Sequence, residues 1–159
     1  MKKYLTQTIK TIKKNIVAPH GTMGKLTLVG EKGLQRFEDD SLQAISRTAV
    51  IDVTSNVSLE PFCMIGHDVM IHSHDHFIPK EGNMLLYAEE NPDKYIIKFD
   101  KYISTGVWIF SNAVILPKCN FIAPGVVIGN SSIVTKPIKE PYSIWAGNPA
   151  KLIKYRSQI

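Results

Sequence analysis

A cluster of histidines is the part of this sequence best suited to chemistry near neutral pH. Four of the five histidines fall within ten residues, at His67, His72, His74 and His76. Imidazole is the side chain that accepts a proton near pH 7, which makes the cluster a candidate source of a general base. The segment after it, IPKEGNMLLYAEENPDK, has the composition of a loop. Long ordered loops are uncommon and usually functional, so histidines at the root of one favour a role in a site.

The elements that must position these histidines are short strands that repeat every six residues. From Lys101 to Lys136 the sequence reads KYISTG, VWIFSN, AVILPK, CNFIAP, GVVIGN and SSIVTK, with a small or modest first residue in every block after the first. Residues one and three of a strand point the same way, and a repeat of this length is typical of a parallel β-helix. The third residues, all apolar and predicted to face inward, are Ile103, Ile109, Ile115, Phe121, Val127 and Ile133.

The same period begins earlier, at Ile51, in a frame that an excursion at residues 75–94 interrupts. We therefore predict three parts: an N-terminal helix and capping segment (1–48), a hexapeptide β-helix domain with an extruded loop 75–94 (49–136), and a C-terminal tail with a short helix (137–159). The helix at residues 2–16 is predicted to cap the open end of the β-helix, with a membrane-surface or partner-binding role as the alternative. Cys63 and Cys119 fall at inward positions and are interpreted as buried hydrophobes rather than as a disulfide or metal pair.

Composition places the chain among soluble globular proteins of one domain. It has 159 residues, of which 44% are hydrophobic and 21% charged. No apolar run approaches the roughly 18 residues that span a bilayer, and the start lacks the apolar core of a signal peptide, so we expect a cytoplasmic protein. The net charge of +5 suits an anionic ligand. No basic stripe interleaved with aromatic residues is present, which argues against nucleic acid as a partner.

Four motifs carry a resemblance to a known family: HDHFIP before the loop, then GVWIFSNAVILP, VVIGNSSIVTKPI and YSIWAGNPAKLIK. Over roughly residues 49–155 the chain resembles the hexapeptide-repeat acyltransferases, particularly the maltose, galactoside and capsule-sugar O-acetyltransferases. The resemblance implies an all-β fold, a left-handed parallel β-helix of hexapeptide repeats with an extruded loop and short N- and C-terminal helices. It also implies an O-acetyltransferase that moves the acetyl group of acetyl-CoA to a sugar hydroxyl, without a metal, in the synthesis of cell-surface polysaccharide or glycoconjugate.

In that family a histidine at the foot of the loop is the general base, and the acceptor hydroxyl attacks the thioester directly. Counting without gaps from the inward Ile71 assigns this role to His76, whereas aligning on a histidine followed by aspartate assigns it to His74. We prefer His76. Either histidine needs its second ring nitrogen held by an acceptor, so that the free one can take a proton. Alternation along the strand points Asp75 elsewhere, so it receives no role.

The resemblance further implies that acetyl-CoA lies in a groove between two β-helices of a homotrimer. Phe110 stands where the family has glycine, and Asn130 and Ser131 stand where it has alanine and glycine, so the groove carries extra bulk. The phosphates need cations, which lysines near the C-terminus would supply. The implied contacts are Trp108 and Ser111 at the thioester, Gly129 and Asn130 along the pantetheine, and Thr135, Lys136, Lys151 and Lys154 at the phosphates.

Three other functions remain open from the sequence. An N-acetyltransferase would use the same site on an amino sugar. A zinc protein resembling the γ-type carbonic anhydrases would use His67 and His72, but residues 40–66 supply no third histidine. A non-catalytic trimeric scaffold would leave the histidine cluster, the loop and the basic tail without a role.

Overall fold

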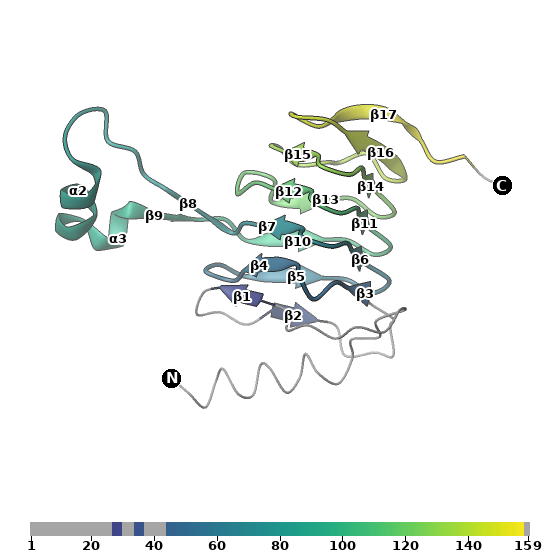
Figure 1. Cartoon of the computed structure of the whole chain (residues 1–159), viewed down its shortest axis with the longest axis horizontal. Helices are drawn as coiled ribbons and strands as arrows, with labels where there is room; N and C mark the ends of the chain where they lie inside the picture. The colour runs from purple at the N-terminus through teal and green to yellow at the C-terminus, as the bar shows by residue number, and fades with distance from the viewer. Residues whose placement is uncertain (1–26, 30–33, 37–43, 158–159) are drawn as a thin grey trace.

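The computed structural model describes residues 27–29, 34–36 and 44–157, and these form a rising coil of short strands (Figure 1). The chain visits three parallel sheets in turn, so that a strand inside a sheet pairs with the strand one coil below and the strand one coil above. The all-β architecture with parallel sheets is confirmed, and its left-handed sense stays a prediction. The predicted helix at 2–16, and most of the predicted capping segment 1–48, lie outside the described residues.

The strands are two to five residues long, and their order along the chain follows the three sheets. The first sheet contains β1 (Thr27–Val29), β4 (Val50–Asp52), β7 (Met70–Ile71), β12 (Val114–Ile115) and β15 (Ile133–Val134). The second contains β2 (Leu34–Arg36), β5 (Val57–Leu59), β10 (Lys101–Ile103) and β13 (Phe121–Ile122). The third contains β3 (Ala44–Ile45), β6 (Met64–Ile65), β11 (Trp108–Ile109), β14 (Val127–Ile128) and β16 (Ser143–Ala146), with β17 (Lys151–Tyr155) antiparallel at its edge. Coil 2 therefore comprises β4, β5 and β6; coil 3 comprises β7, β10 and β11; coil 4 comprises β12, β13 and β14; and coil 5 begins with β15.

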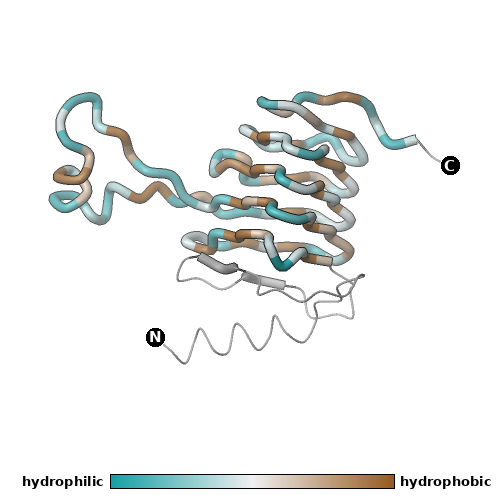
Figure 2. The backbone as a smooth tube through the Cα atoms, in the orientation of Figure 1, coloured by the Kyte–Doolittle hydropathy of each residue, from teal (hydrophilic) through white to brown (hydrophobic). Residues whose placement is uncertain are grey.

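Columns of apolar side chains fill the interior of the coil. In the first sheet Ile51, Ile71, Ile115 and Val134 are register partners in successive coils, and each is at most 2% exposed. Figure 2 shows such apolar residues recurring on successive coils. Burying a Val or Ile side chain stabilises a fold by about 1.5–3 kcal/mol, so these columns are the main source of stability. Cys63 and Cys119 are buried and free, as the sequence predicted.

The six-residue frame slips by one residue after β12, which the sequence did not predict. The inward residues are Ile115 and then Ile122, followed by Ile128 and Val134, whereas Phe121, Val127 and Ile133 are half-buried on the outer face. The extra residue is taken up in the turn at 116–120, where the Cys119 N–H donates to the Leu116 carbonyl at 3.0 Å. The predicted inward role of those last three residues is therefore wrong.

A long arm leaves the coil where the chain passes from the first to the second sheet in coil 3 (Figure 1). We call the place of this passage, in every coil, the arm corner. The arm contains an antiparallel pair, β8 (His74–His76) with β9 (Ile96–Lys98), and two helices, α2 (Met84–Glu90) and α3 (Pro92–Tyr95). It thus extends beyond the predicted loop 75–94 and is ordered rather than irregular, and the hexads resume at β10 rather than near residue 95. No helix in the described part of the chain is long and apolar enough to cross a membrane.

The C-terminal helix is a wrong prediction, because residues 151–155 form the strand β17. Antiparallel pairing joins Ile144 to Lys154 and Ala146 to Lys151. A basic segment this short cannot sustain a helix on its own, whereas the edge of β16 offers backbone groups that a strand can satisfy. All five residues of β17 are exposed.

Candidate active site

The most highly organised polar group at the arm corner is the pair of Asp52 and His74. Asp52 is the last residue of β4 and His74 the first of β8, and the Asp52 Oδ2 and His74 Nδ1 atoms lie 2.6 Å apart. The carboxylate is buried, with 4% of the residue exposed, whereas the imidazole is 24% exposed. A carboxylate that holds one ring nitrogen fixes the tautomer, with the proton on Nδ1 and a free lone pair on Nε2.

The backbone around Asp52 reinforces this orientation. Its carboxylate accepts the N–H groups of Thr54 at 2.9 Å, Ser73 at 2.7 Å and His74 at 3.1 Å. Burial alone would raise the pKa of Asp52, but hydrogen bonds from Thr54, Ser73 and His74 outweigh burial and lower that pKa to about 2. Asp52 is therefore ionised at neutral pH and binds both the ring and the backbone of His74.

His76 and His72 lie beside this pair in different surroundings. The His76 ring is exposed, stacks on Tyr95 of α3 at a centroid distance of 4.6 Å, and meets the His74 ring edge-on at 5.0 Å. No hydrogen bond to either ring nitrogen of His76 is found among the described residues. His72 is partly buried, and burial lowers the pKa of its imidazole, which favours the neutral form.

His67 does not belong to this group. Its Nδ1 atom lies 2.9 Å from the Oγ of Ser46, and its carbonyl accepts the N–H of Asn112, at the turn between the third and first sheets. The structure thus brings together three of the four clustered histidines. In the described ranges, which begin at residue 27 and have gaps up to residue 44, no three His, Cys, Asp or Glu side chains meet as a metal site would require.

Trp108 and its neighbours form a second region on the third sheet. Trp108 points outward, is 40% exposed, and stacks on Phe110 with ring centroids 4.4 Å apart. Ser111 lies at the following turn, where its carbonyl accepts the N–H of Ser131, so that Ser111 and Asn130 occupy the same turn in successive coils. A Cβ at Gly129 would come within 3.0 Å of the Ala146 Cβ, so a side chain there would be crowded.

The four predicted phosphate contacts fall into two groups. Lys151 and Lys154 are exposed in β17, and Lys154 continues the outward row that runs through Trp108, Val127 and Ile144. Thr135 and Lys136 are also exposed but follow β15, at the arm corner of coil 5. Within one chain the structure therefore places Lys151 and Lys154 with Trp108, and Thr135 and Lys136 above the histidines.

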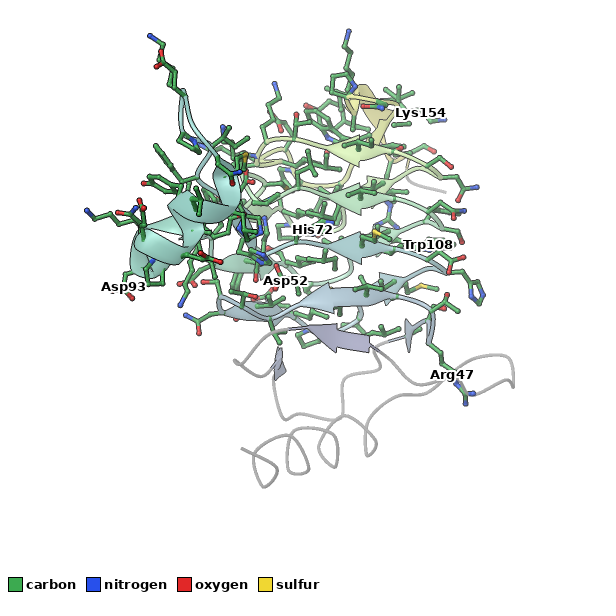
Figure 3. All side chains as sticks on the ribbon, turned by 60° about the vertical axis from the view of Figure 1, so that its left-hand side comes forward. Arg47, Asp52, His72, Asp93, Trp108 and Lys154 are labelled. Atoms are coloured by element: carbon green, nitrogen blue, oxygen red, sulfur yellow. The ribbon has the colours of Figure 1, made fainter. Side chains whose placement is uncertain are left out.

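The histidines and the tryptophan lie on different sides of the molecule. In Figure 3, Asp52 and His72 are near the arm, whereas Trp108 and Lys154 lie toward the opposite side. A proton acceptor and a groove for the acyl donor must adjoin to react. Within a single chain, the predicted base and the predicted thioester contacts are not brought together.

Sequence reasoning missed Asp52 and Lys101 as parts of this region. Asp52 becomes a neighbour of His74 because hydrogen bonds in the lower coils join residues about one coil apart, as the Val50 N–H does with the Val69 carbonyl. Stacking the hexads in threes places Asp52 next to Met70, because three hexads are eighteen residues, whereas the strands of the first sheet pair at an offset of twenty, as Ile51 does with Ile71. Lys101 was noticed only as an exception to the pattern of small first residues, although that exception put a lysine at an inward position.

Comparisons with known proteins agree with this architecture. No family model matches the chain. A chloramphenicol acetyltransferase of Klebsiella aerogenes is 34% identical over 115 residues, which are 66% of this chain and 54% of that protein. The chain thus spans about half the length of this curated relative.

Solved structures show the same coil. A hexapeptide-repeat acetyltransferase of Vibrio cholerae in complex with acetyl-CoA superposes with a TM-score of 0.60 at 18% identity, covering 73% of this chain and 58% of that one. A polySia-specific acetyltransferase superposes with a TM-score of 0.52 at 28% identity, covering 76% of this chain and 56% of that one. The first likeness concerns the fold alone.

Proposed function

Because the chain resembles the hexapeptide-repeat acetyltransferases in both sequence and fold, we propose that it transfers the acetyl group of acetyl-CoA to a hydroxyl of an acceptor, with His74 as the general base. The observation that carries the proposal is the Asp52–His74 pair at the root of the arm, with Nδ1 and Oδ2 2.6 Å apart. His76, which we preferred from the sequence, would instead present its ring to the acceptor together with Tyr95. In keeping with the resemblance, the coil would be left-handed.

The reaction follows from the orientation of His74. Its Nε2 takes the proton of the acceptor hydroxyl while the hydroxyl oxygen attacks the thioester carbonyl carbon. The resulting imidazolium is stabilised by the ionised Asp52 and returns the proton to the sulfur as the C–S bond breaks. The products are the acetyl ester and free CoA. Catalysis by such a base contributes about 10²–10⁴-fold, and holding the two substrates in place supplies much of the rest.

The acyl donor would bind along the third sheet of a neighbouring copy in a homotrimer. Trp108 is 40% exposed and stacks only on Phe110 among the described aromatic residues, which suits a ring that a partner or ligand covers. Ser111, Gly129 and Asn130 would follow the pantetheine, and Lys151 and Lys154 would meet the phosphates. Thr135 and Lys136, at the arm corner, would then belong to the adjacent chain's side of the same groove.

The acceptor is proposed to be a sugar hydroxyl, in polysaccharide or glycoconjugate synthesis. The polySia-specific acetyltransferase, which acts on a sugar polymer, favours this class. Chloramphenicol, for which the Klebsiella relative is named, also carries hydroxyl groups and is the second candidate. Both acceptors would use the same base, so the chemistry of the site does not depend on the choice.

Two measurements test the activity. Calorimetric titration with acetyl-CoA, and with desulfo-CoA as a non-reacting mimic, should show saturable binding. Acceptor panels of mono- and oligosaccharides and of chloramphenicol are then scored by release of the CoA thiol. If acetyl-CoA binds but no acceptor in the panel causes release of the CoA thiol, the proposed acceptor classes are wrong. If neither acetyl-CoA nor desulfo-CoA binds, the proposed activity itself is contradicted. Lys151→Gln and Lys154→Gln, which each remove one proposed phosphate contact, should weaken acetyl-CoA binding in the same titration. Lys94→Gln, which removes one charge from an exposed position on α3, serves as their control.

Complementation tests whether the site is shared between chains. In a homogeneous assembly His74→Ala should be inactive, and Trp108→Ala should be slower at acetyl-CoA concentrations below saturation. Mixed assemblies of the two variants, formed by refolding them together, should regain part of the activity, because some sites then combine an intact His74 with an intact Trp108 from another chain. Under those conditions, mixtures no more active than the sum of the two separate variants would show that one chain supplies both groups.

A further inference from the structure

A buried lysine at the arm corner has no role in the chemistry above. Lys101 is the first residue after the arm, is only 2% exposed, and begins β10 at an inward position. Its Nζ donates to the carbonyls of Leu116 at 2.7 Å, Cys119 at 2.6 Å and Pro117. A lysine is rarely buried to this degree unless partners compensate for the lost water, and three backbone carbonyls match the three N–H groups of an ammonium.

The three carbonyls belong to the turn that breaks the six-residue frame. That turn, residues 116–120, is the arm corner of coil 4, and its extra residue leaves carbonyls turned toward the interior. Backbone carbonyls buried without a donor are costly. The Lys101 ammonium therefore donates hydrogen bonds to the carbonyls of this wide turn, which an apolar residue at this position could not do.

The same lysine connects the coils on either side of the arm. Its own N–H donates to the carbonyl of Asn56, in the arm corner of coil 2, at 2.7 Å. In coil 3 the corner is replaced by the arm, whose ends are closed by the bond from the Phe99 N–H to the Ser73 carbonyl at 2.8 Å. Lys101 thus links coil 2 to coil 4 at the arm corner, where the arm leaves coil 3.

A short path leads from the turn to the proposed base. The carbonyl of Ile115, the residue before the turn, accepts the N–H of His72 at 2.9 Å, and His72 lies two residues before His74. On the other side, the Ser55 N–H donates to the Ser73 Oγ at 2.9 Å. Any shift of the turn would therefore displace the strand that presents His74 to Asp52.

We propose that Lys101 is a positioning residue: its ammonium group holds the wide turn at residues 116–120 against the root of the arm and thereby keeps His74 in register with Asp52. The inference deepens the proposed function, on which its relevance to catalysis rests. The titratable groups that interact with Lys101 include Asp52, His72 and the Cys119 thiol. Burial lowers the pKa of Lys101 to about 8, partly offset by Cys119 and Asp52, so the amine is mostly protonated at neutral pH.

The test begins with Lys101→Met, which keeps the volume of the side chain and removes the charge. Its melting temperature should fall by roughly 5–10 °C, because three carbonyls lose the Lys101 donor, and of these the Leu116 carbonyl keeps the Cys119 N–H. A structural loss alone would produce this fall, so the decisive measurement is the ¹⁵N NMR spectrum of the His74 ring, assigned with His74→Gln. In the wild-type chain we expect a protonated Nδ1 in a strong hydrogen bond, and in Lys101→Met a mixture of tautomers.

Chemical rescue supplies a second variant. Lys101→Ala lacks three carbons and the amine, which n-propylammonium matches atom for atom. This amine should restore the melting temperature and the His74 signal in a saturable way, whereas n-propanol and sodium chloride should not. If Lys101→Ala folds only when n-propylammonium is present, its refolding yields with n-propylammonium and with n-propanol give the same comparison. Lys118→Met, an exposed lysine in the same turn, should change neither reading.

The outcomes are distinct from those of the proposed activity, because neither reading uses acetyl-CoA. A lower melting temperature with an unchanged His74 signal would overturn the positioning role and leave Lys101 as structural support only. An unchanged melting temperature, or equal rescue by n-propanol, would overturn the role of the ammonium. An altered His74 signal in Lys101→Met that n-propylammonium reverses in Lys101→Ala would support it.

Discussion

Replacing Asp52 with asparagine tests the electrostatic core of the site. The folded-state pKa of Asp52 is about 2, against 3.8 for an unperturbed aspartate, because the hydrogen bonds from Thr54, Ser73 and His74 outweigh burial. A difference of this size corresponds to about 2 kcal/mol of stability. Because the folded-state value is the lower one, the unfolded chain binds more protons as the pH falls from 3.8 to 2, and the contribution is lost across that window.

The assay is denaturant unfolding of the wild-type chain and of Asp52→Asn at several pH values. The stability difference between the two should be largest above pH 4 and should shrink by about 2 kcal/mol by pH 2. As a control, Asp93→Asn replaces an exposed aspartate on α3, and its unfolding free energy should change with pH in the same way as that of the wild type. In the acetyl-transfer assay, Asp52→Asn should lower kcat by about 10²–10⁴-fold, since the ring loses its fixed tautomer and the imidazolium its counter-charge. The reasoning would be refuted if the unfolding free energies of the wild type and Asp52→Asn changed with pH in the same way and the kcat of Asp52→Asn stayed within a few-fold of wild type.

Three further predictions concern the coil and the donor groove. Burial raises the pKa of Cys63 to about 12 and of Cys119 to about 11, so neither thiol should react with Ellman's reagent until the chain is unfolded; fast reaction of the native protein would contradict their inward positions. Gly66→Ala should lower the unfolding free energy by roughly 1–3 kcal/mol, because a Cβ there would lie 2.8 Å from the Ser111 backbone nitrogen, and an unchanged denaturation midpoint would argue against that close packing. Trp108→Ala should weaken acetyl-CoA binding by about 2–10-fold in calorimetry, the equivalent of one lost aromatic contact, and unchanged affinity would remove Trp108 from the donor site.

The coil was predictable because its signal repeats. Each hexad places apolar residues on the inner face, so stacked apolar columns follow from the period, although the exact partners do not, because Ile51 and Ile71 lie twenty residues apart rather than eighteen. The slip after β12 was not predictable, because Phe121 and Ile122 are both apolar and either could have faced inward. The helix α2 had a usable signal, since Asn83 caps it by accepting the N–H groups of Leu85 and Leu86. The strand β17 depends on the free edge of β16, which no local pattern reveals.

The candidate site was predictable only in part. The histidine cluster and the arm were visible as a composition change and a broken period. The choice between His74 and His76 depends on Asp52, which comes from a different coil and reads in the sequence as an ordinary polar residue after Ile51. Likewise the structural fit of Lys101 depends on a turn fifteen or more residues away. Both contacts arise from stacking, and a motif within one hexad does not encode them.

The most direct test of the account compares two substitutions in the same cluster. Single-turnover acetyl transfer should be measured for His74→Gln and His76→Gln, with acetyl-CoA affinity determined separately for each. The account predicts a loss of at least about 10²-fold in rate for His74→Gln with unchanged donor affinity, and less than about tenfold for His76→Gln. The opposite order would contradict the assignment of the base to the histidine that Asp52 holds.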